Sequence, residues 1–184
     1  LNMAPSKIIL GLDPGTNLMG FGIIKSNNTS IKLVQYGVIK MNKEKEHHKK
    51  LRTIFKTVND LIKEFKPHDI SIEAPFYGKN VQSMLKLGRA QGAAIIAGEM
   101  NKINIFEYAP KKIKQSVTGN GNASKEQLSE MVKNIIGIKK LEKNKFDATD
   151  ALGAAICHLY QKSNNQRPNK SWKNFIQTNP DKII

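Results

Sequence analysis

Apolar and polar residues alternate along the first forty positions in the short runs that predict β-strands. Residues 7–13, 19–25 and 31–40 are rich in β-branched and apolar side chains. Pro14-Gly15 follows the first run, and Ser26-Asn27-Asn28 separates the second from the third. Because these connections are short, the three runs are expected to pair as a meander.

The next apolar pattern changes to the helical period. Seven apolar residues between 51 and 65 recur at spacings of three and four, and Pro67 marks the end of the helix: Leu51, Ile54, Phe55, Val58, Leu61, Ile62 and Phe65. Residues 69–73 form another strand-like run. A helix between two strands makes a crossover, which favours parallel pairing of residues 69–73 with an earlier strand.

The second half of the chain alternates helices with one more strand. Residues 79–101 are expected to be helical, 104–108 to form the fifth strand, and Pro110 to occupy the first turn of the following helix. Ser124 and Gln127 have the spacing of a capping box, so another helix should open there. A last helix is expected over about residues 145–161. This order predicts an α/β fold with a mixed five-stranded sheet and helices on both faces.

The domain organisation is expected to be simple, because 184 residues are enough for one domain with a real core. Residues 1–6 are interpreted as a leader or cloning remnant and residues 7–162 as the folded domain. Residues 163–184 are interpreted as a basic, flexible tail, since they are rich in Asn, Gln, Pro and Lys and have little periodicity.

Four carboxylates stand where strands end or a helix begins. Asp13 and Glu73 close two apolar strands, and such ends of parallel strands meet at one edge of a sheet. Asp147 and Asp150 share one face of the last helix, where they could also merely complement the helix dipole. Converging carboxylates repel one another unless a cation offsets them, and an oxygen-only set suits Mg²⁺ or Mn²⁺.

The charge of the chain favours a polyanionic partner. Thirty Lys and Arg against fifteen Asp and Glu give a net charge of +15, which points first to nucleic acid and second to an anionic membrane surface. A basic surface that only aids solubility is the alternative. Cys157 is the single cysteine, so no disulfide can form within the chain, and a reducing cytoplasmic setting is expected. No apolar stretch approaches the ~20 residues of a membrane span.

Several motifs in order resemble the RuvC family of Holliday-junction resolvases, over about residues 7–160. They are Gly11-Leu12-Asp13-Pro14-Gly15-Thr16-Asn17, Ile72-Glu73, Lys79-Asn80, Leu85-Lys86-Leu87-Gly88, Tyr108-Ala109-Pro110, Val117-Thr118-Gly119 with Gly121, and Asp147-Ala148-Thr149-Asp150-Ala151-Leu152. The resemblance implies a ribonuclease-H-like fold, a homodimer and paired nicking of four-way DNA junctions. It also implies that Asp13, Glu73, Asp147 and Asp150 are the catalytic carboxylates.

The chemistry expected of such a site is two-metal phosphodiester hydrolysis. Two divalent ions ~4 Å apart can clamp the scissile phosphate, with one activating water and the other stabilising the leaving oxygen. Mg²⁺, or alternatively Mn²⁺, is the expected cofactor, and Asp13 is the candidate bridging ligand. The resemblance further implies ligatable 3′-hydroxyl and 5′-phosphate ends and contact with a branch-migration helicase.

The expected DNA contacts lie around the carboxylates. Lys114 and Lys125 flank the Gly119–Gly121 loop and match basic positions that sit near DNA in the family, so binding should weaken with salt. Phe76 and Tyr77 could stack on an unpaired base, although a hydrophobic staple is the alternative, and for Tyr77 the favoured one. Lys79 and Arg89 complete the expected set.

Other readings of the sequence remain open. Gly-x-Asp-x-Gly-Thr also marks the phosphate loop of actin-type ATPases, but these proteins need two such domains and the chain has room for one. A non-catalytic DNA-binding module would leave the four acids unexplained. A nuclease acting on RNA–DNA hybrids is the alternative within the enzyme class, because a fold does not fix its substrate.

Overall fold

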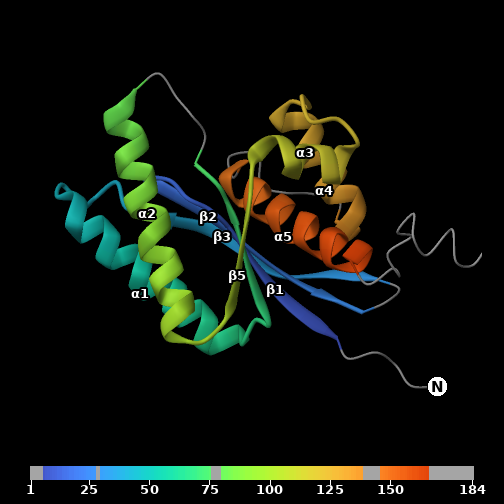
Figure 1. The fold of residues 1–184 in the computed structure, drawn as a ribbon, viewed down its shortest axis with the longest axis horizontal. Coiled ribbons are helices and arrows are strands. Elements are labelled where there is room, and N and C mark those ends of the chain that lie inside the picture. The colour runs from blue at the N-terminus through green and yellow to red at the C-terminus, as the bar shows by residue number, and fades with distance from the viewer. Residues whose placement is uncertain (1–5, 28–29, 76–79, 139–145, 166–184) are drawn as a thin grey trace, which may run out of the picture.

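The computed structural model describes residues 6–27, 30–75, 80–138 and 146–165, with side chains up to 162 (Figure 1). Its elements follow the predicted order: β1 (Lys7–Asp13), β2 (Leu18–Ser26), β3 (Ile31–Lys40), α1 (His47–Phe65), β4 (Asp69–Glu73), α2 (Val81–Met100), β5 (Asn104–Tyr108), α3 (Pro110–Thr118), α4 (Lys125–Ile136) and α5 (Phe146–Asn165). The expected α/β fold is therefore confirmed.

The five strands form one sheet in the order β3-β2-β1-β4-β5. β1 pairs antiparallel with β2 and β2 with β3, which confirms the meander. β1 pairs parallel with β4 and β4 with β5, as the crossovers through α1 and α2 require. The carboxyl ends of β1 and β4, which carry Asp13 and Glu73, consequently lie side by side.

Helices cover both faces of the sheet (Figure 1). α1 and α2 lie on one face and α3, α4 and α5 on the other. The side chains of β1 alternate between them, so that Leu10 and Leu12 join the core under α1 and α2, while Ile9 joins the core under α4 and α5. In the same alternation Gly11 and Asp13 face α5.

The helix ends follow local chemistry. Ser124 accepts a hydrogen bond from the Gln127 amide while the Gln127 side chain accepts from Ser124 N–H, and Pro110 begins α3, so both predicted starts are confirmed. α1 begins at His47, four residues before the first apolar position, because its first turn is polar and invisible to periodicity. α5 ends at Asn165, three residues past the expected domain end at 162. Within the described ranges, no helix is both long and apolar enough to cross a membrane.

The edge strand β3 contains one irregularity. Ile23 of β2 pairs with Gln35 and Ile24 with Leu33, so Val34 is an extra residue without a partner on β2. An insertion of this kind is a β-bulge, which increases the local twist of the strand.

Glycines on β1 and β2 let α5 lie unusually close to the sheet. A Cβ added at Gly20 would lie 1.9 Å from the carbonyl oxygen of Asp147, and one at Gly11 would lie 1.9 Å from that of Ala151. Gly20 pairs with Asp13 and Gly11 pairs with Gly22 across β1 and β2. The glycines therefore form a lane on the sheet, beside Asp13, along which the backbone of α5 runs.

Replacing Gly20 by alanine is expected to push the first turn of α5 away from the sheet. The added methyl group would collide with backbone atoms, which cannot rotate away, so the free energy of unfolding should fall by ~1–3 kcal/mol or more. Urea unfolding of Gly20→Ala measures this change. Lys56→Ala is the control, because Lys56 is exposed on α1 and alanine favours a helix. Equal midpoints for Gly20→Ala and wild type would contradict the close contact.

Candidate metal centre

The centre is built on the adjacent carboxyl ends of β1 and β4. Leu12 pairs with Ile72, so Asp13 and Glu73 are the next residues along the two parallel strands. Side chains two positions apart on a strand face the same side of the sheet. Asp13 therefore faces the same side as Gly11, which meets the Ala151 backbone, and Glu73 the same side as Ser71, which bonds to Ala154. Both carboxylates consequently point to the α5 side of the sheet.

The first turn of α5 brings two more carboxylates to the same place. Asp13, Asp147 and Asp150 each offer one oxygen, and these three oxygens all lie within 4.8 Å of one another. The close approach of α5 to Gly20 allows this convergence, since it brings the Asp147 backbone against the strand partner of Asp13. Of the four acids expected from the sequence, three thus form one compact cluster.

Glu73 belongs to the same electrostatic environment. Burial raises the pKa of Asp13 to about 8, and Glu73 is the neighbouring carboxylate that adds most to the rise. Burial likewise raises the pKa of Glu73 to about 7, with a further contribution from the negative charge of Asp150. The pKa of Asp150 is also raised by burial, although Lys125 opposes the shift. The four acids therefore destabilise one another when all are ionised.

Two lysines lie close enough to act on the acids. Lys125 Nζ is 3.1 Å from Asp150 Oδ2, an ion pair between a half-exposed ammonium and a buried carboxylate. Lys114 on α3 lowers the pKa values of Glu73 and Asp150 through its charge. Both lysines were expected to contact DNA; the ion pair of Lys125 with Asp150 was not expected.

The loop between α3 and α4 is fixed by Gln115. The Gln115 amide donates to the carbonyl of Gly119 at 2.7 Å, and its oxygen accepts from the N–H of Gly121 at 3.0 Å. Ser124 then caps α4 through the capping box, and Lys125 is the first residue of this helix. Lys125 is therefore presented to Asp150 by an ordered turn, and the sequence analysis did not identify Gln115 as the residue that orders it.

The remaining expected DNA contacts are distributed differently. Phe76, Tyr77 and Lys79 lie outside the described residues. Arg89 is exposed on α2, which covers the other face of the sheet, and its positive charge acts on His47 at the start of α1. Arg89 is thus not brought beside the carboxylates.

The donor set fits a divalent cation. All ligand atoms of the cluster are carboxylate oxygens, the donors that Mg²⁺ and Mn²⁺ prefer. Burial first, and then the negative charge of neighbouring acids, raises the pKa values of Asp13 and Glu73, and Lys125 does not fully offset the rise in either. A cation among these oxygens would relieve that repulsion.

Comparisons with known proteins agree with this geometry. The family model described as crossover junction endodeoxyribonuclease RuvC matches residues 9–158. The chain belongs to the RuvC family. Among its relatives, the RuvC protein of Cytophaga hutchinsonii is 54% identical and that of Porphyromonas gingivalis 47%, with 96% and 98% of this chain and 88% and 100% of theirs aligned.

Solved RuvC structures have the same fold. Thermus thermophilus RuvC in complex with a Holliday-junction substrate aligns with a TM-score of 0.81 and 25% identity, over 86% of this chain and 96% of that one. The structure of the same RuvC without the junction gives a TM-score of 0.77 over the same shares. The expected ribonuclease-H-like class is accordingly confirmed at the level of the RuvC fold.

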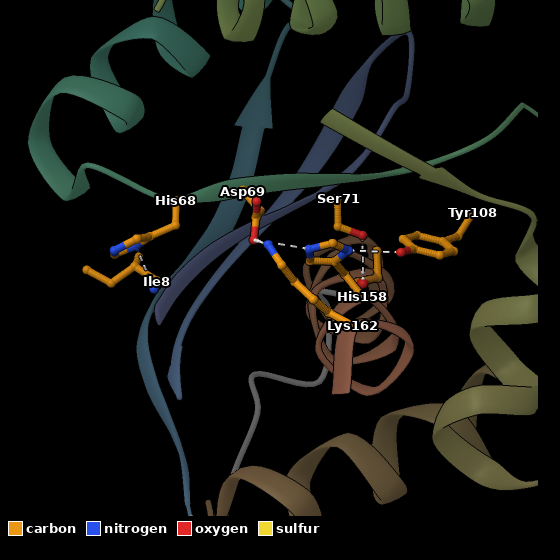
Figure 2. Close-up of polar contacts among 8 residues, drawn as sticks. Ile8, His68, Asp69, Ser71, Tyr108, His158 and Lys162 are labelled. Carbon is orange, nitrogen blue, oxygen red and sulfur yellow. Dashed lines mark hydrogen bonds and ion pairs between the residues drawn. The ribbon is translucent and has the colours of Figure 1, made fainter. Parts of the chain in front are cut away.

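A second buried polar cluster escaped the sequence analysis. Asp69, Tyr108, His158 and Lys162 converge between β4, β5 and the second half of α5 (Figure 2). The four residues lie on three different elements, so no spacing in the sequence reveals their contact.

The metal-free protein should lose stability as pH rises. Asp13 has an ordinary pKa of 3.8 and a folded pKa of about 8, so the folded state binds the extra proton. The stabilising effect of this proton is fully present below pH 3.8 and is lost as pH rises through 8. With chelator present, Asp13→Asn should therefore be about 1–3 kcal/mol more stable than wild type at pH 8.5, with a smaller difference at pH 5.5.

Thermal unfolding at the two pH values, with and without Mg²⁺, measures these differences. Mg²⁺ should stabilise wild type more at pH 8.5 than at pH 5.5, and should stabilise Asp13→Asn less. A wild-type protein that gains stability between pH 5.5 and 8.5 without metal would contradict the interpretation of the centre.

Proposed function

We propose that this chain is a metal-dependent endonuclease that resolves four-way DNA junctions by paired nicks during recombination and repair. Its membership of the RuvC family supports the reaction, and the Thermus thermophilus relative bound to a Holliday junction supports the substrate. The observation that carries the proposal is the convergence of Asp13, Asp147 and Asp150 within 4.8 Å in a chain of net charge +15. Such a chain attracts a polyanion and holds it beside a cation site.

Asp13, Glu73, Asp147 and Asp150 are proposed to hold two Mg²⁺ ions, or Mn²⁺, with Asp13 as the shared ligand. When bound, such a pair of ions supplies activation of water and stabilisation of the leaving oxygen. Asp13 suits the shared position because the negative charges of all three other acids contribute to the rise in its pKa. Asp147 and Asp150 would ligate the ions from α5, and Glu73 would ligate them from β4.

Lys114 and Lys125 are proposed to bind the DNA backbone next to the scissile phosphate. Both act electrostatically on the acidic cluster, so a phosphate held by the cluster would lie within reach of their charges. Neither lysine is placed to take a proton from water, because ammonium groups at neutral pH only donate. Their contribution is orientation, and hydrolysis is expected to leave 5′-phosphate and 3′-hydroxyl ends. Phe76, Tyr77, Lys79 and Arg89 are proposed as further DNA contacts on the strength of the family resemblance alone.

The protein is proposed to act as a homodimer through α2. One stripe of this helix combines exposed apolar side chains with glycines at which a Cβ would meet nothing: Val81, Leu85, Gly88, Gly92, Ile96 and Met100. Four of its side chains are 51–70% exposed. A second copy of the same stripe would cover them, and a two-fold axis would direct two centres to like strands of a four-way junction.

Three further features of the function are proposed from the family alone. The nuclease domain comprises residues 7–162 together with the last turn of α5, which ends at Asn165. It works in the cytoplasm, where the buried lone thiol of Cys157 stays reduced. A branch-migration helicase is its partner on the junction.

Asp13→Asn is expected to bind junction DNA and fail to nick it. The amide keeps the size of the side chain but removes the charge that ligates metal, so the nicking rate should fall by more than the ~10–100-fold that loss of an outer-shell metal partner costs. The assay uses a mobile four-way junction, end-labelled on each strand, with Mg²⁺ or Mn²⁺. Asp60→Asn, an exposed carboxylate on α1, is the matched control and should nick normally.

Linear duplex and RNA–DNA hybrid run beside the junction. Symmetric, ligatable nicks on two opposing strands of the junction alone would support the proposal. Cutting of the hybrid instead would discard the junction as substrate and keep the metal centre. Wild-type nicking by Asp13→Asn would remove the catalytic role of the carboxylates.

Leu85→Glu is expected to convert the dimer into a monomer, because it buries two like charges at the proposed α2 contact. Sedimentation equilibrium should show half the wild-type mass at equal protein concentration. Met131→Glu is the control, since Met131 is 38% exposed on α4, away from the stripe. A wild-type monomer at micromolar concentration, or a Leu85→Glu dimer, would contradict the proposed interface.

A further inference from the structure

The first half of α5 meets the sheet through a surface with few features. Gly11 and Gly20 contact backbone atoms of the helix, and the helix contributes the small side chains Ala148 and Ala151, with the larger Leu152 packed against Gly22. Helices normally keep their axial position by interlocking side-chain ridges with grooves. A glycine lane against mostly small side chains permits close approach, and its apolar packing, including that of Leu152, fixes the axial position less sharply than a directional bond does.

Two hydrogen bonds join the second half of α5 to the sheet. Ser71 Oγ on β4 donates to the carbonyl oxygen of Ala154 at 2.7 Å, in the buried interior. Tyr108 Oη on β5 lies 2.8 Å from Nδ1 of His158, which is 1% exposed (Figure 2). These two bonds attach successive turns of α5 to two neighbouring strands. Because a hydrogen bond has a narrow range of length and angle, each resists axial movement.

A buried charge strengthens the same attachment. Asp69 is 1% exposed, and its Oδ2 lies 2.6 Å from Lys162 Nζ and 3.3 Å from His158 Nε2. The Nε2 contact lacks hydrogen-bond geometry, and burial lowers the pKa of His158, so Lys162 is the cation that pairs with Asp69. Burial raises the pKa of Asp69, but Lys162 and His158 outweigh it and bring the pKa below its ordinary value. Asp69 is therefore ionised and holds the end of α5 to the start of β4.

The attachment lies far from the acidic centre along both elements. Asp69 and Glu73 lie four positions apart on β4, a distance of about 13 Å along the strand. Asp147 and His158 lie eleven positions apart on α5, about 16 Å along the helix. Asp69, Ser71 and Glu73 have the same parity on β4. β4 thus carries Glu73 at the end near the acidic centre and Asp69 at the other end. In the same way, α5 carries Asp147 near the centre and His158 at the attachment.

The consequence for the centre follows from helix geometry. A slip of one residue along α5 would move Asp147 and Asp150 by 1.5 Å relative to Asp13 and Glu73. A displacement of about 1 Å at a reacting group can cost ~10²-fold in rate. The carboxylates of α5 therefore need an axial reference, and directional bonds provide a sharper one than the apolar packing of the glycine lane.

We propose that Ser71, Tyr108 and His158, with the buried charge of Asp69 behind them, are positioning residues that set the axial register of α5 and thereby the spacing of the metal-binding carboxylates. This inference rests on the proposed nuclease function. None of these residues touches the substrate or the metal. They act through the helix that carries Asp147 and Asp150.

The double variant Ser71→Ala/Tyr108→Phe tests the proposal, because it removes two hydroxyl groups and leaves the packing of both side chains nearly unchanged. In the folded variant, single-turnover nicking at saturating Mg²⁺ should fall at least ~10-fold, while the dissociation constant for junction DNA stays within about twofold. Asn59→Ala is the matched control. It removes a 2.9 Å hydrogen bond between α1 and α2 on the opposite face and should leave nicking intact.

Each outcome decides the question. Wild-type nicking by the folded double variant overturns the proposal. The proposal is also overturned if Asn59→Ala loses as much nicking at an equal shift of the urea midpoint. It is overturned as well if weaker junction binding accounts for the loss of nicking. If the double variant does not fold, Tyr108→Phe alone is measured in the same way.

A separate readout distinguishes this proposal from the proposed function. Mn²⁺ affinity, followed by the electron paramagnetic resonance of the free ion, should weaken several-fold in the double variant and not in Asn59→Ala. If the wild-type protein nicks no junction, the proposed function fails, and the Mn²⁺ measurement still tests the register of the carboxylates. Equal Mn²⁺ affinities in the wild type and the double variant would overturn the positioning role.

Discussion

The close contact between α5 and the first two strands is the constraint on which the acidic centre depends. A helix normally stands off a sheet by the thickness of its side chains, which would hold Asp147 and Asp150 away from the end of β1. Gly11 and Gly20 remove that thickness, so that helix backbone meets strand backbone. The antiparallel register then matters, because it sets Gly20 directly beside Asp13. Asp13, Asp147 and Asp150 converge as a result, and the charge of Glu73 acts on the same cluster.

This convergence has a cost that the rest of the domain must offset. Burial and mutual repulsion raise the pKa values of Asp13, Glu73 and Asp150, so the centre destabilises the fold when it is ionised and without metal. Apolar cores on both faces of the sheet supply the compensating stability. Lys125 offsets part of the charge locally, and it does so from a helix start that is fixed by its own capping box. The acids that destabilise the fold and the apolar cores that stabilise it thus lie in separate regions of the domain.

Most of the fold, and the membership of the centre, could be predicted from the sequence because the signals are local. Strand ends at Asp13 and Glu73, the capping box at Ser124 and Pro110 at a helix start are all readable within a few residues. The glycine lane and the cluster around Asp69 were not predicted, because each depends on contacts between distant elements. The pairing of Lys125 with Asp150 was missed for the same reason: a lysine beside a glycine-rich loop reads as a DNA contact, and only the folded chain shows the carboxylate within 3.1 Å.

The bulge in β3 has a consequence for how the molecule avoids unwanted association. β3 is an outer strand of the sheet, and an outer strand exposes unpaired amide and carbonyl groups that can recruit a strand from another molecule. The extra residue at Val34 twists this edge, and Lys32 and Lys40 place positive charge at its two ends. Strand addition between copies is thereby disfavoured at the β3 edge of the sheet.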